Sequence, residues 1–261
     1  MKKTGKRLLA AMLLFCTILI GAAGYEVMAA DEAQSTESTS GTVNSADDLP
    51  GKRIGVQLGT TGDIYVSDYE SDGSGTVVER YNKGADAIQA LKQGKIDCVV
   101  IDEQPAIKFV EQNTGIRILD EEFTLEDYAF VVAKSNTELL DKVNSALEKL
   151  EADGTIANIQ KNYIGTADEI GKFPYESKDV SHENGTLTVG TNAEFPPYES
   201  YEDGQIVGID MDIMRAVSDE LGMELKIEDM AFDSIIPAIS TGKVDIGACL
   251  LYTSPSPRDT R

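Results

Sequence analysis

The sequence predicts an α/β protein built from two similar units. Short apolar strands alternate with amphipathic helices along most of the chain. The segment 96–101 is almost wholly apolar, which is typical of a strand in the middle of a helix-covered sheet. Segment 89–97 resembles 237–245, because each contains a helix end, a Gly-Lys turn and the start of a strand. Two such units, each with a loop suited to a ligand, imply a binding cleft between two lobes.

Composition sets limits on the class of protein. The chain has 261 residues, 41% hydrophobic and 26% charged, which suits a soluble globular protein of one or two domains. Its formal net charge is -22. Because a nucleic-acid binder needs a basic face, this charge argues against nucleic acid and against anionic membrane surfaces as partners.

Residues 1–30 are predicted to be a signal peptide. Four Lys and Arg residues among the first seven precede the uncharged apolar run 8–23, and small residues suited to cleavage follow at 27–30. An uncleaved membrane anchor is the rival, but the run is shorter than the roughly 20 residues that span a bilayer. A lipid anchor on Cys16 is disfavoured because Phe15 stands where a small residue is needed. We therefore expect a secreted or extracytoplasmic protein, in the periplasm or on the outer face of the cell membrane.

The first unit is expected at 48–134, after a flexible spacer at 31–47 that is rich in Ser, Thr and Glu. A strand at 53–58 is followed by the loop 59–62 and the start of a helix. Backbone N–H groups and hydroxyls in such a loop can hold a carboxylate or phosphate. The candidate ligand-binding residues here are Gly59, Thr60 and Thr61, although the alternative is a Gly-Thr turn that binds nothing.

The rest of this unit supplies one more candidate. A strand at 76–81, an amphipathic helix at 83–92 and the strand 96–101 lead to Asp102. This carboxylate lies at the edge where open α/β sheets hold ligands, so it can bind a ligand ammonium group. Its alternative role is to cap the helix that begins near residue 104.

Two helices are predicted to close the first half of the chain. After a strand at 127–134, the stripe Leu139, Leu140, Val143, Leu147 and Leu150 has helical spacing. Gly154 ends that helix, and a shorter one follows. We assign 135–165 to these closing helices and the polar segment 166–185, which is punctuated by Gly and Pro, to a linker.

The second unit is expected at 186–248 and repeats the plan of the first. Its strands and helices are predicted at 187–189, 210–221, 224–227, 232–240 and 244–246. Its most distinctive part is the opening loop 190–198, in which two prolines hold Phe195 and Pro196 in extended backbone and so present the neighbouring aromatic rings. A rigid aromatic loop at a strand end suits a ligand. The alternative is a hydrophobic turn that packs on its own domain.

Cofactors and metals are not expected. The chain has three cysteines, of which Cys16 belongs to the predicted signal, so no disulfide framework follows. With His182 as the only histidine, no zinc cluster and no His-dependent catalytic triad can be built.

The segment 249–261 breaks the α/β pattern. It resembles one translated frame of a transposase sequencing adapter, so we predict that it is not biological. On this interpretation the chain stops in the middle of its second unit.

Two regions resemble polar amino acid ABC-transporter substrate-binding proteins. Segment 188–198 with 208–212 is similar to the beginning of that family, and 52–164 is similar to its other end. The resemblance implies the two-lobed type II periplasmic-binding-protein-like fold, permuted or incomplete here. The order of the segments is reversed from the family's, so either the protein is permuted or a half unit precedes a full one.

The resemblance also implies roles for single residues. The α-ammonium group of an amino acid would be held by Asp102, and its carboxylate by the loop at Thr61 with an arginine from the first lobe. Phe195 and Phe232 match aromatic residues that enclose the ligand side chain, and Asn192 matches a position that often contacts its polar end. The arginine's own segment is overwritten by 249–261, and we assign Arg258 no role.

These patterns predict a binding protein that captures an amino acid by hinge closure and delivers it to ABC permease subunits. It is expected to act as a monomer, without catalysis. One alternative is a cyclohexadienyl dehydratase-like enzyme with Glu194 as its acid, which is disfavoured because no titratable pair converges in the cleft. Another alternative is the ligand-sensing module of a signalling receptor.

Overall fold

The first unit contains a five-stranded sheet with the order β3-β2-β4-β1-β5. The computed structural model describes residues 6–13, 42–126 and 128–252. Strand β2 (Arg53–Gln57) pairs in parallel with β3 (Val77–Tyr81) and β4 (Cys98–Asp102). Strand β1 (Lys6–Leu13) lies antiparallel between β4 and β5 (Ile116–Glu126).

Apolar packing on both faces explains why the central strand β4 is a nearly continuous hydrophobic run. Cys98 and Val100 of β4 join a buried cluster on one face, and Val99 and Ile101 join the cluster on the other. Helices α1 (Thr61–Val66), α2 (Gly84–Lys92) and α3 (Glu103–Gln112), with two short 3₁₀ turns η1 (Ala46–Asp48) and η2 (Ser67–Glu70), connect the strands.

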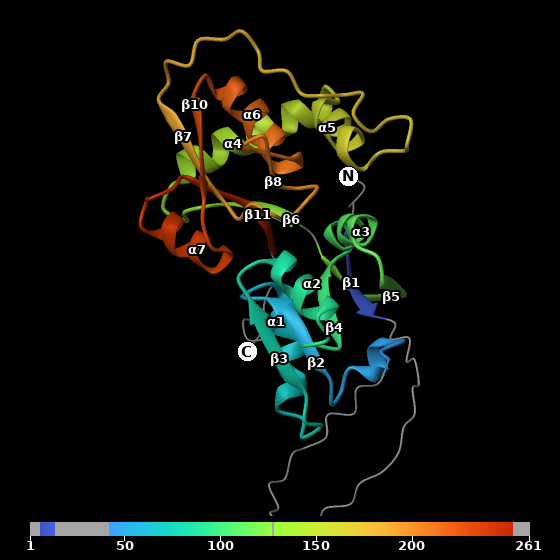
Figure 1. Cartoon of the computed structure of the whole chain (residues 1–261). Coiled ribbons are helices and arrows are strands. Elements are labelled where there is room, and N and C mark those ends of the chain that lie inside the picture. Colours follow the sequence, from blue (N-terminus) through green and yellow to red (C-terminus); the bar gives the residue numbers. More distant parts are fainter. Residues whose placement is uncertain (1–5, 14–41, 127, 253–261) are drawn as a thin grey trace, which may run out of the picture.

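The second unit contains a four-stranded sheet with the order β10-β7-β11-β6. Strand β7 (Thr186–Thr191) pairs in parallel with β10 (Glu224–Asp229) and β11 (Ile246–Tyr252). Strand β6 (Tyr128–Val132) pairs antiparallel with β11. The two sheets form the two lobes seen one above the other in Figure 1.

The chain passes from the first sheet to the second between Glu126, the end of β5, and Tyr128, the start of β6. Helices α4 (Thr137–Ala152) and α5 (Thr155–Ile164) then pack against α6 (Ile209–Leu221), which lies in the second lobe (Figure 1). The change of sheet therefore comes earlier than the predicted boundary at residue 134, because β6 obtains its hydrogen bonds from β11.

The linker is held against α6 by contacts to the carboxylates of Asp219 and Glu220. Between Ile164 and Thr186 the chain has no helix or strand and forms the long loop at the top of Figure 1. The buried Asp219 accepts hydrogen bonds from the Tyr175 hydroxyl at 2.7 Å and the Lys178 N–H at 2.8 Å, and it also pairs with His182. The second lobe is completed by the hairpin of β8 (Ser200–Glu202) and β9 (Gln205–Val207) and by α7 (Phe232–Ser240).

Most predicted elements are confirmed within a few residues, but four strands differ. The sequence does not predict β5 or the β8–β9 hairpin, and it assigns residues 1–30 to a signal peptide outside the fold. In the structure Lys6–Leu13 forms β1, which satisfies backbone groups on the facing edges of β4 and β5. Cleavage of a signal remains a prediction, and most of segment 1–30 lies outside the described residues.

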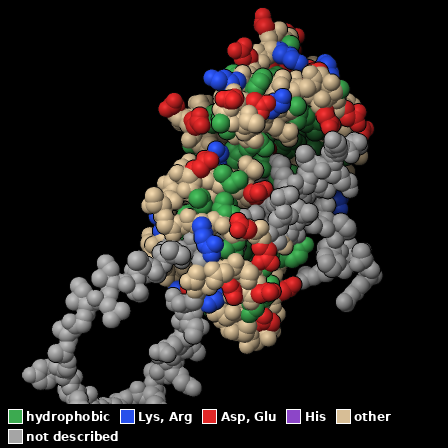
Figure 2. All heavy atoms as spheres, turned by 90° about the vertical axis from the view of Figure 1, so that its right-hand side faces the viewer, with side chains coloured by type: hydrophobic (Ala, Val, Ile, Leu, Met, Phe, Trp, Pro, Cys, Tyr) green, Lys and Arg blue, Asp and Glu red, His purple; other side chains and the backbone are tan. Residues whose placement is uncertain are grey.

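The end of the second unit also differs from expectation. Strand β11 continues to Tyr252, past the predicted end of ordinary sequence at 248, whereas 253–261 lies outside the described residues. The adapter interpretation of 249–261 remains a prediction. In the described part of the chain, no helix is long and apolar enough to cross a membrane. Figure 2 shows acidic side chains spread over both lobes on the face in view.

The packing of α4 on α6 provides a stability test. Leu150 is fully buried, whereas Leu140, which the sequence placed in the same stripe, is 40% exposed. Leu150→Ala is expected to lower the free energy of unfolding by about 2–5 kcal/mol, because it leaves a cavity in the core. Leu140→Ala on the same helix is the control and should change it by less than about 0.5 kcal/mol. Urea unfolding followed by circular dichroism measures both values, and equal losses would contradict this packing.

Candidate functional site

The Gly-Thr loop after β2 is ordered by its own polar groups. Gly59 has a positive φ of 80°, and its N–H donates to the Asp63 carboxylate at 2.9 Å. The Thr60 hydroxyl donates to the Gln57 carbonyl at 2.8 Å and accepts from the Asp63 N–H, so it caps α1. Thr61 is buried in the first turn of that helix. The loop therefore has a defined shape, with one of its two hydroxyls committed to the backbone.

This loop lies against the second unit. A Cβ atom on Gly59 would lie 3.8 Å from Phe232 Cδ1 and 3.7 Å from Asp233 Cβ, at the beginning of α7. Two of the sequence-predicted residues, Gly59 and Phe232, are thus brought together from opposite units.

Asp102 ends β4 and stands at the N-cap position of α3. Its side chain makes no capping hydrogen bond. Instead the carboxylate accepts a hydrogen bond from the hydroxyl of Tyr128, the first residue of β6. Of the two roles left open by the sequence, the helix cap is therefore not observed, and the carboxylate is buried near the crossing between the sheets.

Asn192 is also engaged across the two units. Its side-chain oxygen accepts from Gln57 Nε2 at 2.7 Å, and its Nδ2 donates to the Met230 carbonyl at 2.7 Å. Both side chains are buried. Sequence reasoning missed Gln57, although a polar residue at the last position of a buried strand was a usable signal.

The opening loop forms a compact turn around its aromatic rings. Phe195 is buried, and its ring stacks on Tyr198 with centroids 6.4 Å apart. Tyr198 in turn lies 5.7 Å from the ring of Tyr128. The Phe195 N–H donates to the Glu199 carbonyl at 2.7 Å, which closes the turn. Phe195 is therefore part of the core and also one member of an aromatic row leading to Asp102.

Negative charge surrounds this row. Burial raises the pKa of Tyr198, and nearby carboxylates raise it further; they belong to Asp102, Asp210, Glu199 and Glu103. Burial also raises the pKa of the Cys249 thiol, which donates to the Glu199 carboxylate at 2.7 Å. The interface between the units is thus an acidic, partly aromatic environment.

All seven sequence-predicted residues lie on segments at or just beyond the carboxyl ends of parallel strands, in the two units. Gly59, Thr60 and Thr61 follow β2, and Asp102 ends β4. Asn192 and Phe195 follow β7, and Phe232 begins the helix after β10. The contacts Gly59 to Phe232 and Gln57 to Asn192 show that the two carboxyl edges meet.

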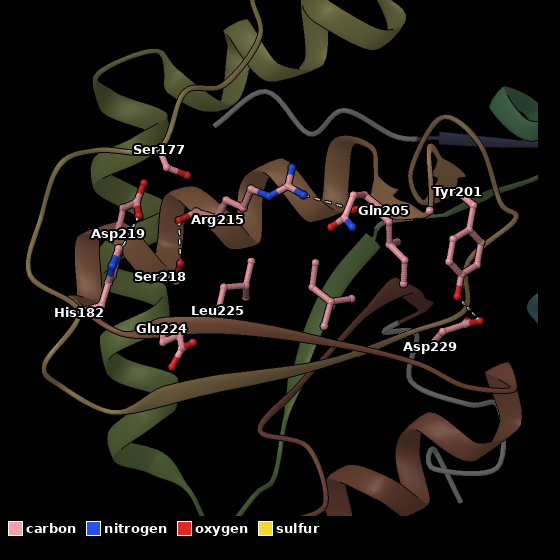
Figure 3. A pocket seen from close by; sticks show the side chains of 13 residues that line it. Ser177, His182, Tyr201, Gln205, Arg215, Ser218, Asp219, Glu224, Leu225 and Asp229 are labelled. Carbon is pink, nitrogen blue, oxygen red and sulfur yellow. Dashed lines mark hydrogen bonds and ion pairs between the residues drawn. The ribbon is translucent and has the colours of Figure 1, made fainter.

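A separate groove of about 610 Å³ lies in the second lobe between α6, β10 and the β8–β9 hairpin (Figure 3). The pair His182 and Asp219 lies at one end at 3.1 Å, and Tyr201 donates to Asp229 at the other at 3.0 Å. None of the predicted site residues lines this groove. Among the described residues, no group of three or more His, Cys, Asp and Glu side chains is arranged to hold a metal ion.

Residues 74–166 and 187–258 match the sequence profile of the bacterial extracellular solute-binding proteins, family 3. The chain belongs to this family. The first matched segment runs from β3 to α5 and so covers part of the first lobe and the early elements of the second. The second matched segment begins in β7, and the linker lies between the two. Both regions on which the sequence resemblance rested are therefore within or overlap the family match.

Individual relatives of this family 3 protein resemble only part of it. The L-cystine-binding protein TcyJ of Escherichia coli K12 is 30% identical over 51% of this chain and 50% of its own length. The L-arginine-binding protein of Pseudomonas aeruginosa is 34% identical over 45% of this chain and 48% of its own. An ancestral arginine-binding protein bound to arginine is 30% identical, with a TM-score of 0.49 and 62% of each chain covered. The chain spans about half the length of the curated relatives it matches.

The opening loop of this family 3 protein depends on a glycine. Gly208 has a φ of 137°, and a Cβ there would lie 2.1 Å from the Tyr198 carbonyl oxygen. Gly208→Ala is expected to cost about 1–3 kcal/mol more unfolding free energy than Gly204→Ala. Gly204 also has a positive φ, but nothing lies within 4 Å of its added Cβ. The difference between the two variants therefore measures the cost of the clash at Gly208. Urea unfolding measures both, and equal costs would show that the loop does not pack this way.

Proposed function

We propose that this protein is the extracytoplasmic substrate-binding component of an ABC transporter for amino acids, holding its ligand between two lobes by hinge closure. The observation that carries the proposal is the meeting of the two carboxyl edges, each of which supplies polar and aromatic groups. Membership of the solute-binding family supports it. A ligand that contacts both lobes at once favours the closed arrangement over the open one.

Complementary groups at this interface support an amino acid as the ligand. The Asp102 carboxylate suits an α-ammonium group, and Thr61, in the first turn of α1, offers its N–H and its hydroxyl to a carboxylate. Phe195 and Phe232 supply apolar walls for a side chain, from the opening loop and from α7. Asn192, which the resemblance linked to the ligand's polar end, is proposed here to act mainly through its bond to Gln57.

The charge at the interface favours a cationic amino acid. Burial raises the pKa of Tyr198 and four nearby carboxylates raise it further, and the negative potential of these carboxylates stabilises a positive ligand. The row of aromatic rings suits a guanidinium group, which stacks well on such rings. The relatives include proteins named as arginine-binding and as L-cystine-binding. We therefore place arginine ahead of cystine, because only arginine carries a net positive charge at neutral pH.

The proposed site of action follows from the family. Its members are described as extracellular, so capture occurs outside the cytoplasm and the ligand passes to ABC permease subunits in the membrane. Binding requires no catalysis and no cofactor, and a single chain supplies both faces of the proposed site.

Ligand binding is tested by thermal shift with the twenty amino acids and cystine. Arginine at a hundredfold excess over its Kd should raise Tm by about 5–10 °C, with smaller effects from cystine and none from glutamate, because carboxylates repel it. Stabilisation by none of these compounds would refute the proposed function, and a preference for glutamate would refute the charge argument.

The role of Asp102 is tested by calorimetry with the amino acid that gives the largest shift. Asp102→Asn should weaken binding at least about tenfold, because it replaces a charge-assisted hydrogen bond with a neutral one. Asp141→Asn makes the same chemical change at an exposed position on α4 and should leave Kd unchanged. Equal affinities for the two variants would show that Asp102 does not contact the ligand.

A further inference from the structure

An ion pair joins the two lobes outside the residues assigned to the ligand. Lys83 precedes α2 in the first lobe, and Glu194 lies in the opening loop of the second. Lys83 Nζ lies 3.0 Å from Glu194 Oε1, and the side chains are 32% and 44% exposed. Because the partners come from different lobes, the pair exists only when the lobes are close together.

The backbone of Glu194 is adapted to this contact. Its φ is 86°, a left-handed conformation that non-glycine residues rarely adopt. Such conformations persist where the surroundings hold them and are concentrated at functional sites. The preceding residue is held by the Asp229 carboxylate, which accepts from the Ala193 N–H at 3.0 Å. Asp229 also accepts from the Tyr201 hydroxyl, so the loop is braced from within its own lobe.

A second interlobe contact lies close by in the same loop. Gln57 Nε2 donates to Asn192 Oδ1 at 2.7 Å, and Gln57 and Asn192 are 4% and 3% exposed. A buried amide pair of this kind is costly to separate unless water replaces both partners. The two contacts complement one another, since one is ionic and partly exposed and the other is neutral and buried.

We propose that Lys83–Glu194 and Gln57–Asn192 together form an interlobe latch that favours lobe closure and thereby sets ligand affinity. Both contacts join protein to protein, so they act whether or not a ligand is bound. The effect on affinity rests on the proposed function, whereas the effect on closure does not. Lys83 and Gln57 are thus positioning residues, which act through the opening loop rather than by touching the ligand.

The charges around Lys83 are consistent with an intact ion pair at neutral pH. Burial lowers the pKa of Lys83, but Glu194, Asp229 and Tyr201 raise it, and the net change is upward. The stabilisation that the charged Lys83 contributes is therefore fully present at pH values below 10.5, the ordinary pKa of lysine. It is lost as the pH rises through the raised pKa of Lys83.

The latch affects ligand affinity by changing the fraction of molecules whose lobes are closed. If only the closed arrangement binds tightly, the apparent Kd equals the intrinsic Kd divided by the closed fraction, so it rises as that fraction falls. An exposed ion pair changes such an equilibrium by about twofold to fivefold, and a buried amide hydrogen bond by up to about tenfold. These changes are measurable without identifying the ligand.

Closure is measured by single-molecule energy transfer between dyes on Asp72→Cys and Asp141→Cys, exposed positions in the first and second lobes. Cys16→Ser is included, and Cys98 and Cys249 are buried. Without added amino acid, Glu194→Gln should raise the ratio of open to closed molecules about twofold to fivefold, and Gln57→Leu up to about tenfold. In the protein with the intact Lys83–Glu194 ion pair, 0.5 M salt should shift the ratio of open to closed molecules toward that of the Glu194→Gln variant, because salt screens the charges.

Two matched variants separate the latch from general effects. Glu228→Gln removes the carboxylate of the Lys226–Glu228 pair, which lies within β10 of one lobe, and should leave the ratio unchanged. The double exchange Lys83→Glu with Glu194→Lys should restore closure toward that of the starting protein. An unchanged ratio in Glu194→Gln and Gln57→Leu, or failure of the exchange to restore it, would overturn the latch.

The same molecules distinguish this proposal from the proposed function. If an amino acid closes the starting protein while latch variants behave identically to it, the latch is wrong and the binding function stands. If the latch variants open but no amino acid alters closure or Tm, the latch stands and the amino acid function is wrong.

Discussion

The arrangement of the whole molecule depends on the antiparallel pairing of β6 with β11. Through this pairing the chain leaves the first sheet and becomes the edge strand of the second, before the second unit's own strands have been reached in sequence. Helices α4 and α5 follow β6 in the chain and therefore lie in the same lobe, where both pack against α6. Residues 128–164, in the middle of the chain, thus complete a lobe that is mostly built from later sequence.

The same crossing organises the interface between the lobes. Tyr128 is the first residue of β6, and its hydroxyl reaches Asp102 at the end of β4 while its ring contacts Tyr198 of the opening loop. The strand that links the lobes therefore also connects an acid of the first to an aromatic of the second. Buried, hydrogen-bonded groups of this kind lie where two lobes meet, and that position allows a bound molecule to alter the balance between open and closed arrangements.

Sequence patterns predicted the regular elements well and the candidate site in part. The spacing of apolar residues changes from every second residue to every 3.6 residues, and this change predicted α4. A continuous apolar run predicted β4, because burial on both faces requires apolar residues at every position. Strand β5 was missed because Ile116–Glu126 carries several charges, and its pairing depends on neighbours. The roles of Asp102 and Asn192 were left open or incomplete, since their hydrogen-bond partners Tyr128 and Gln57 are distant in sequence.

The sequence by itself determined the α/β class, the two-unit plan, the family and the loops at the strand ends, because each depends on local periodicity or on short contiguous motifs. Only the tertiary structure decided which strand completes which sheet, that Phe195 is packed in the core, and that Glu194 and Asn192 of the opening loop contact Lys83 and Gln57. The last two contacts join side chains more than a hundred positions apart, whose proximity no local pattern encodes. The aromatic loop at the start of the second unit is therefore recognisable in sequence, but its partners are set by the fold.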